Sequence, residues 1–360
     1  MALGVLLCGC VPASDLPPMM PAQPDTGWAG DGSTTGERGS TGREGPVDDA
    51  TLESTGAVES DAPESSGDVA STGTSGEDER GVGSSCGGHD GRPAALEPII
   101  PIPTGGCPTL QGGMPELVTF EADGVVRDAY IYSDPAAGGG GPLVFFFHGS
   151  GGNPQQAVAT LGAQSVDEIL AMGGVIVAPA PSGQAEIEWF LTTGLGDQDL
   201  RLMDEVVGCL HHDGPGIDPW QVHLVGFSAG ALHSSQASFR RNAYVASIVG
   251  YSGGLAFPGV PQVEAWVPPA MLFHGGEDDV VLGFSFEYST DAHAIAVGEA
   301  GGFCMSCDHQ TGHDYPPNEV GVWRRADAIN FLLDHRYGTE VSPYAVYGAP
   351  SWVPPYCETG

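Results

Sequence analysis

Apolar segments of five or six residues alternate with amphipathic segments along the C-terminal part of the chain, and this alternation limits the fold more than any other feature. The apolar segments occupy residues 142–147, 174–179, 221–225, 246–250 and 270–274, two more strands are expected at 117–120 and 127–132, and the amphipathic segments occupy 166–172, 200–211, 231–241 and 326–335. A strand buried on both faces is apolar throughout, and parallel strands need a helical connection. The pattern therefore predicts an α/β fold class with a mostly parallel central sheet and helices on both faces.

The first 95 residues have a different composition. Residues 14–95 are rich in Ser, Thr and Gly and carry 16 acidic residues against four arginines. Because few large apolar side chains are present to offset the entropy of ordering this segment, we expect a disordered, self-repelling linker. The folded domain is then expected to span residues 96–360, with residues 1–13 as a signal segment.

The charge of the chain excludes some partners. It carries 46 acidic residues and 11 arginines, with no lysine, which gives a formal net charge of −35. Such a chain repels nucleic-acid phosphates and anionic lipid headgroups. We therefore expect no nucleic-acid partner and no polybasic membrane patch.

Residues 1–13 begin with a short apolar segment that is too short to span a membrane. Its sequence Leu-Cys-Gly-Cys at 7–10 resembles a bacterial lipobox, which implies lipid attachment at Cys10 and a location in the cell envelope or outside the cell. The alternatives are a plain cleaved signal, which gives a secreted protein without lipid, and an unremarkable N-terminus, in both cases with two incidental cysteines.

A serine stands between glycines at the point where a predicted strand meets a predicted helix. The sequence Gly-Phe-Ser-Ala-Gly at 226–230 needs small residues for so sharp a turn, which exposes the hydroxyl of Ser228 and aims a helix N-terminus at it. Ser228 is therefore the candidate nucleophile. The glycine-rich loop at 148–152 follows an earlier strand, so the amides of Ser150 and Ala229 are the candidate oxyanion-hole donors.

A base and an acid follow the serine in chain order. Residues 274–281 come after a later strand and supply acids, and His313 lies in a loop before the closing helix. In this arrangement His313 accepts the proton of Ser228, and a carboxylate holds the histidine tautomer and stabilises the imidazolium.

These motifs together give a family resemblance. From about residue 107 to 338 the chain resembles an α/β-hydrolase without a large cap domain, and it is most similar to secreted polyhydroxybutyrate depolymerases, feruloyl esterases and acetyl xylan esterases. The resemblance implies a serine carboxylic-ester hydrolase that needs no cofactor and no metal. It selects Asp278, four residues after His274, as the acid and leaves Asp279 in a usually variable place. The chain departs from the family at His233, which replaces an apolar residue, and in a last sheet strand that we expect to be shortened or absent.

The cysteines suggest disulfides in an exported chain, since six remain after the leader. They are Cys86, Cys107, Cys209, Cys304, Cys307 and Cys357. A disulfide between Cys304 and Cys307, or between either of them and Cys357, would clamp the histidine loop. A zinc site at Cys304, Cys307, His309 and His313 is the competing interpretation.

The substrate is less constrained than the chemistry. Trp189 and Phe190 lie on a loop expected to overhang the serine, where they could bind an aromatic acyl group or a sugar. The alternative is that both side chains pack in the core. The stretch 252–269 is too short for a cap, so we expect an open cleft and a feruloyl, acetyl or polyhydroxyalkanoate ester, carried by plant cell-wall polysaccharide or by a polyester. The alternatives are a serine peptidase of the same fold and a catalytically idle surface binding module.

Overall fold

The computed structural model describes residues 96–112, 114–183, 188–189, 191, 197–256, 266–318 and 323–359. The predicted signal segment and linker, with Cys10, Cys86 and Phe190, lie outside the described residues. Lipid attachment at Cys10 therefore stays a prediction.

Within the described residues, nine strands form one sheet in the order β1-β2-β4-β3-β5-β6-β7-β10-β11. They are β1 (Glu116–Ala122), β2 (Val125–Ser133), β3 (Gly141–Phe147), β4 (Val175–Pro179), β5 (Ile217–Phe227), β6 (Ser247–Tyr251), β7 (Ala270–His274), β10 (Cys304–Asp308) and β11 (Cys357–Thr359). The six strands from β4 to β10 in this order are parallel, and β1, β2 and β11 add antiparallel edges. The predicted mostly parallel sheet is confirmed.

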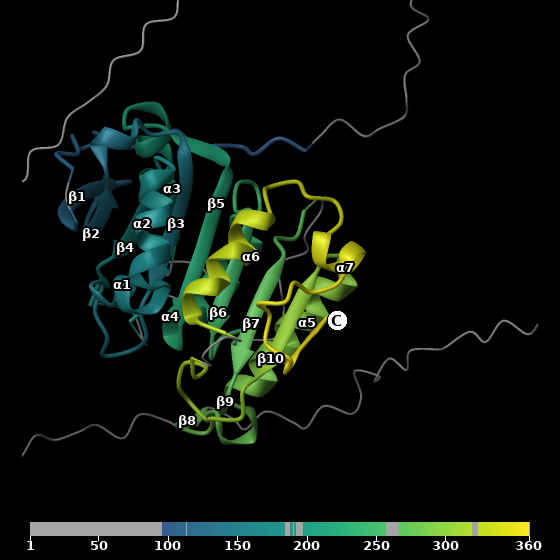
Figure 1. The fold of residues 1–360 in the computed structure, drawn as a ribbon. Helices are drawn as coiled ribbons and strands as arrows, with labels where there is room; N and C mark the ends of the chain where they lie inside the picture. Colours follow the sequence, from purple (N-terminus) through teal and green to yellow (C-terminus); the bar gives the residue numbers. More distant parts are fainter. Residues whose placement is uncertain are drawn as a thin grey trace, which may run out of the picture. The chain divides into compact units, whose positions relative to one another are not determined.

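Helices cover both faces of this sheet. They are α1 (Gln156–Leu161), α2 (Ala163–Ala171), α3 (Gln198–His212), α4 (Ala229–Arg240), α5 (Phe286–Glu299), α6 (Ala328–Asp334) and α7 (Pro343–Tyr347). Figure 1 shows α6 in front of the strands, where it contacts β5 and β6. None of the helices in the described ranges is both long and apolar enough to cross a bilayer.

The sequence of β3 explains why both faces are covered. Leu143, Phe145 and Phe147 belong to the core cluster that includes α3, α4 and α5. Val144 and Phe146 point to the other face and belong to the cluster of α1, α2 and α6. Since successive side chains of a strand alternate between faces, a continuous apolar run fits only a strand with a core on each side.

Strand β10 corrects one expectation. It has five residues, as many as β6 and β7, and pairs in parallel with the whole of β7, so the prediction of a shortened or absent strand is wrong. The segment between α5 and His313 is long enough for this strand because the chain reverses direction immediately after α5. Gly301 has a positive φ of 75°, and Gly302 N–H donates back to the carbonyl of Val297 at 2.8 Å.

The cysteines pair in a way that strand geometry explains. Cys307 of β10 is bonded to Cys357 of β11, and Cys304 is a buried free thiol. Cys304 and Cys307 are three positions apart on one strand, so their side chains lie on opposite faces and enter different core clusters. The pairing with Cys357 is thus confirmed for Cys307, whereas a disulfide between Cys304 and Cys307 is wrong. Burial raises the pKa of the Cys304 thiol to about 12, which keeps it protonated.

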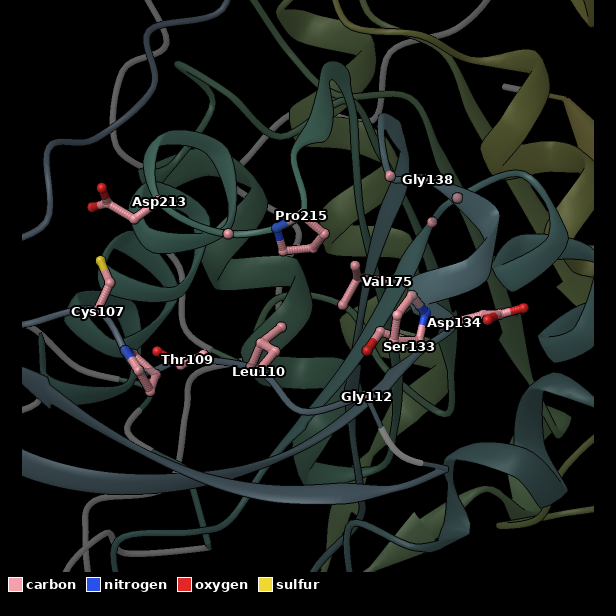
Figure 2. Close-up of a pocket in the computed structure, with 16 residues that line it drawn as sticks. Cys107, Thr109, Leu110, Gly112, Ser133, Asp134, Gly138, Val175, Asp213 and Pro215 are labelled. Atoms are coloured by element: carbon pink, nitrogen blue, oxygen red, sulfur yellow. The ribbon is translucent and has the colours of Figure 1, made fainter.

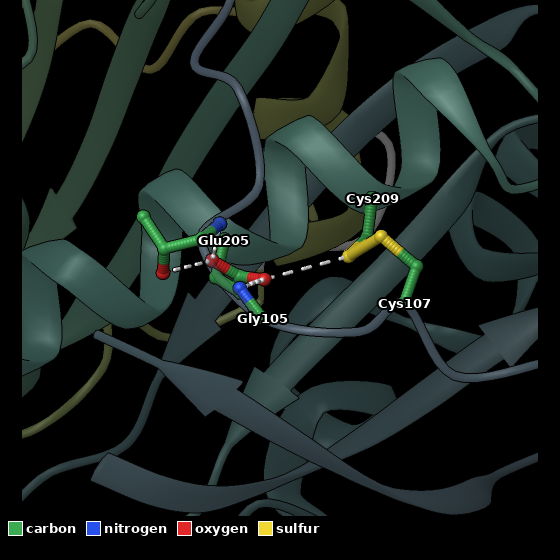
Figure 3. Close-up of a disulfide and its surroundings, with 5 residues drawn as sticks. Gly105, Cys107, Glu205 and Cys209 are labelled. Atoms are coloured by element: carbon green, nitrogen blue, oxygen red, sulfur yellow. Dashed lines mark hydrogen bonds between the residues drawn. A yellow bond between two sulfur atoms is a disulfide. The ribbon is translucent and has the colours of Figure 1, made fainter. Parts of the chain in front are cut away.

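A second disulfide ties the segment before β1 to helix α3. Cys107 is bonded to Cys209, 102 residues later in the chain. The buried carboxylate of Glu205, one turn earlier on α3, accepts hydrogen bonds from Thr104 N–H and Oγ and from Gly105 N–H at 2.7, 2.8 and 2.9 Å (Figure 3). The covalent and the polar contacts therefore hold the same short stretch of chain.

Removing this disulfide should lower stability markedly. A cross-link that closes a loop of about 100 residues stabilises the fold by about 3–5 kcal/mol, chiefly by restricting the unfolded chain. The double variant Cys107→Ser/Cys209→Ser should therefore unfold at a clearly lower urea concentration than the parent. Cys304→Ala, which removes a free thiol, is the control and should cost about 1 kcal/mol. Equal urea midpoints for the double variant and the parent would contradict the assigned disulfide.

Candidate active site

Ser228 lies at the sharp turn between β5 and α4. Its backbone has φ 53° and ψ −122°, a conformation that residues other than glycine rarely adopt. A Cβ atom on Gly226 would come within 2.4 Å of the carbonyl oxygen of Gly230, and one on Gly230 within 2.0 Å of the carbonyl oxygen of Phe147. The small residues predicted on both sides of the serine are thus required by backbone contacts.

His313 connects this serine to a buried carboxylate. Its Nε2 lies 2.9 Å from Ser228 Oγ, and its Nδ1 lies 2.7 Å from Asp279 Oδ1. Because a carboxylate only accepts hydrogen bonds, Nδ1 carries the proton and Nε2 is left to accept from the serine hydroxyl. The structure therefore brings Ser228 and His313 together as expected, in the geometry of a nucleophile and its base.

The carboxylate that contacts His313 is that of Asp279, so the prediction that Asp278 lies against this histidine is wrong. Residues Gly276–Asp278 form a 3₁₀ turn directly after β7, which leaves Asp278 exposed to solvent. Asp279 follows the turn, is fully buried and faces His313. In this chain the turn places the residue that follows it, rather than its last residue, toward His313.

The loops that carry the acid and the histidine meet at two glycines. Gly312 N–H donates to the carbonyl of Gly275 at 3.0 Å. A Cβ atom on Gly275 would lie 1.9 Å from the carbonyl oxygen of Gly312, so a larger residue would push the loops apart. This contact fixes the approach of His313 to Asp279.

Two phenylalanine rings flank the imidazole of His313. The ring of Phe286 lies 4.5 Å and that of Phe227 5.3 Å from it, measured between centroids. Tyr315 stacks on Phe227 at 4.3 Å, and its hydroxyl is hydrogen-bonded to Thr160 Oγ at 2.8 Å. Burial raises the pKa of Tyr315 to about 12, so its phenol stays neutral. Its stacking on Phe227 and its hydrogen bond to Thr160 hold the ring of Phe227 beside His313.

The loop expected to bind the oxyanion lies against the serine. A Cβ atom on Gly149 would come within 3.1 Å of the Cβ atom of Ser228. Ala229 is the first residue of α4, and among the described residues its N–H has no backbone or side-chain acceptor. Gly151 N–H, by contrast, donates to Glu188 Oε1 at 3.0 Å. The roles of Ser150 and Ala229 as oxyanion donors stay predictions.

Trp189 does not line the cleft, so its predicted role in substrate binding is wrong. The side chain is fully buried, and its indole N–H donates to the carbonyl of His148 at 2.8 Å. Its ring contacts those of Phe147 and His233, at centroid distances of 5.1 and 5.7 Å. Trp189 therefore packs against the glycine-rich loop from the core side. His233, where the family usually has an apolar residue, completes this aromatic cluster. Burial also lowers the pKa of His148.

The four candidate zinc ligands do not converge. Cys307 is consumed by its disulfide, and Cys304 points into the core on the opposite face of the sheet. His309 Nδ1 is hydrogen-bonded to Thr311 Oγ, and His313 contacts the serine and the aspartate. Across the described ranges no group of three or more His, Cys, Asp or Glu side chains could hold a metal ion.

A large cavity lies at the amino ends of the parallel strands, whereas Ser228 lies at their carboxyl ends. Its volume is about 680 Å³, and it is lined by the loops that precede β3, β4 and β5, including Gly139, Gly173 and Pro215 (Figure 2). Since β5 runs for 11 residues between this edge and Ser228, at about 3.3 Å per residue, the cavity is roughly 30 Å from the serine. It does not belong to the catalytic site.

Comparisons with known proteins show the fold. No protein-family model and no curated protein matches the chain. Among solved structures, a pOPH variant in complex with DMSO is 18% identical over 71% of this chain and 96% of its own, with a TM-score of 0.55. Native sOPH is 16% identical, with the same coverage and a TM-score of 0.54. A pOPH variant in complex with pNPB is 17% identical, with the same coverage and a TM-score of 0.54. At these identities the similarity establishes the α/β-hydrolase fold and leaves the activity to the site.

Proposed function

We propose that the chain is a serine hydrolase that cleaves carboxylic esters through an acyl-enzyme on Ser228. The observation that carries the proposal is the continuous hydrogen-bonded series from Ser228 through His313 to the buried Asp279. It stands at the carboxyl ends of parallel strands, where α/β folds bind their ligands.

The geometry supports a two-step acyl transfer. His313 Nε2 takes the proton of Ser228 Oγ as the oxygen attacks the ester carbonyl, and Asp279 stabilises the imidazolium that forms. The oxyanion lies near the N-terminus of α4, where the free N–H of Ala229 and the helix dipole stabilise negative charge. His313 then protonates the leaving alcohol, and a water molecule, activated by the same histidine, hydrolyses the acyl-enzyme.

The surface beside the triad supports an ester with an apolar component. Asp279 leads into a hairpin of β8 (Val280–Val281) and β9 (Phe284–Ser285), in which both valines and Leu282 are exposed (Figure 1). Together with the net charge of −35, this favours uncharged esters of the feruloyl, acetyl or polyhydroxyalkanoate type over anionic substrates. The two disulfides support export to an oxidising compartment.

A panel of p-nitrophenyl esters of rising chain length, with methyl ferulate, acetylated xylan and a solid polyhydroxyalkanoate, tests the proposal. The full chain should hydrolyse several p-nitrophenyl esters, and the best of the three natural-type substrates identifies the class. Cleavage of peptide bonds with no turnover of any ester would overturn the proposal in favour of a peptidase. Turnover of neither would favour a binding module.

The hairpin tip offers a variant that separates substrate contact from folding. Leu282 and Gly283 both have positive φ, 51° and 81°, and asparagine suits the first position of such a turn better than leucine. Leu282→Asn should therefore keep or raise the urea midpoint. It should lower kcat/KM about threefold to tenfold on long-chain esters, as expected for lost contact with one or two methylene groups, and leave p-nitrophenyl acetate unaffected.

Tyr347→Ser is the control, because Tyr347 is also highly exposed but lies on α7, away from the hairpin (Figure 1). It should leave both activities unchanged. Equal activity of Leu282→Asn and the parent on every chain length would remove the hairpin from the substrate site.

A further inference from the structure

The carboxylate of Asp279 is held on both of its oxygens. Oδ1 faces His313, whereas Oδ2 accepts hydrogen bonds from Ser252 Oγ and from Gly275 N–H, each at 2.9 Å. Asp279 and Ser252 are both fully buried. Ser252 therefore makes the only side-chain hydrogen bond to Oδ2 among the described residues.

Ser252 is placed for this contact by the carboxyl end of β6. Its N–H donates to the carbonyl of Phe273 on the adjacent β7 at 2.8 Å, and its φ of 48° is unusual for any residue other than glycine. The preceding carbonyl, of Tyr251, accepts from Ser228 N–H at 2.9 Å. The last residue of β6 and the residue that follows it thus hold the backbone of the nucleophile and the side chain of the acid.

A serine in a left-handed backbone conformation with a buried hydroxyl is an unfavourable choice for stability alone. Glycine would adopt this φ without strain, and it would bury no polar group. The hydroxyl is useful only through its partner, which is Asp279. The cost of this position is therefore connected with the triad rather than with the packing of β6.

We propose that Ser252 is a positioning residue of the triad, whose hydroxyl fixes the rotation of the Asp279 carboxylate so that Oδ1 points at His313 Nδ1. The terminal torsion of an aspartate is broad and nearly two-fold, so one backbone N–H on Oδ2 leaves it loosely defined. A second donor restricts it, and hydrogen bonds to an ionised acceptor are the strong ones. This inference rests on the proposed esterase function and adds a residue to its site.

Two substitutions separate this role from a structural one. Ser252→Gly removes the hydroxyl and suits the backbone, so the relief of backbone strain offsets the lost hydrogen bond and the urea midpoint should stay close to that of the parent. On p-nitrophenyl butyrate kcat should fall about 10- to 100-fold at nearly constant KM. Ser252→Thr keeps the hydroxyl but puts a β-branched residue at positive φ, so it should be less stable and retain most of the kcat of the parent. Ser252→Gly should therefore lower turnover at nearly constant stability, and Ser252→Thr should lower stability at nearly constant turnover.

Two controls test the partner. Ser247 is a buried serine at the start of β6, the strand that precedes Ser252, and its hydroxyl is hydrogen-bonded to His223 at 2.9 Å. Ser247→Ala should lower stability without lowering kcat. In an Asp279→Ala background the hydroxyl of Ser252 has no carboxylate to hold, so adding Ser252→Gly should cause less than a twofold further loss.

The inference is overturned if Ser252→Gly keeps kcat within threefold of an active parent, or if its loss is equally large in the Asp279→Ala background. In both cases the parent still hydrolyses esters and reacts with a fluorophosphonate, a probe that modifies activated serines, so the proposed function stands. A parent that neither hydrolyses esters nor reacts with the probe would instead overturn the function and, with it, this inference.

Discussion

Replacing Ser228 with alanine is expected to lower kcat for ester hydrolysis by about 10⁴- to 10⁶-fold. The nucleophile is lost, and only the oxyanion site and substrate binding remain to accelerate attack by water. The substitution also removes the hydroxyl that His313 Nε2 contacts at 2.9 Å, but it leaves Gly226 and Gly230 to make the turn. The free energy of unfolding should therefore change by less than about 1 kcal/mol, as measured by urea titration of the same preparation used for kinetics.

His313→Ala should cause a loss of similar size, and the double variant should be little worse than either single one, because the two side chains act as a unit. His309→Ala is the control from the same loop, since His309 Nδ1 bonds Thr311 rather than a triad member. It should remain within about tenfold of the parent. Full additivity of the Ser228 and His313 losses would contradict a shared proton transfer.

The second large effect is expected at Asp279. Asp279→Asn should reduce kcat by roughly 10⁴-fold, because an amide no longer selects the tautomer in which Nδ1 carries the proton. Asp278→Asn should stay within about tenfold of the parent, a difference of about 1.4 kcal/mol, because its side chain lies in solvent beside the 3₁₀ turn. The two variants remove the same charge at adjacent positions, so they control for each other.

The two variants Asp278→Asn and Asp279→Asn show which carboxylate supports His313: Asp279, as the structure indicates, or Asp278, as the family spacing implies. A dead Asp278→Asn beside an active Asp279→Asn would show that the turn at Gly276–Asp278 is wrong, and it would leave the nucleophile and the base in place. Equal, small losses for both would mean that neither carboxylate supports the histidine, which would contradict a triad of this form.

The fold could be predicted because its signals are local. A run such as residues 142–147 is apolar in every position, and this is compatible only with burial on both faces of a sheet. Ser228 was predictable for the same reason, since the glycines that permit its turn are its near neighbours in sequence. His313 followed from chain order and from a loop placed before the closing helix.

The remaining site residues depend on contacts that the sequence does not display. The choice between Asp278 and Asp279 rests on one 3₁₀ turn, and two adjacent acids carry no periodicity that would reveal it. Trp189 was misplaced because a side chain on a loop at the carboxyl ends of the strands can point either to the substrate or into the core. Ser252 was missed. A polar residue directly after a buried strand, at the carboxyl ends of the parallel strands, was a usable signal.

Reaction with a fluorophosphonate probe, followed by peptide mass mapping, tests the central claim most directly. A fluorophosphonate reacts with a serine hydroxyl only where a base accepts its proton and donors stabilise the charged adduct. The account predicts a single adduct on the peptide that contains Ser228, absent in Ser228→Ala and strongly slowed in Asp279→Asn but not in Asp278→Asn. An unlabelled parent, or an adduct on any other serine, would contradict it.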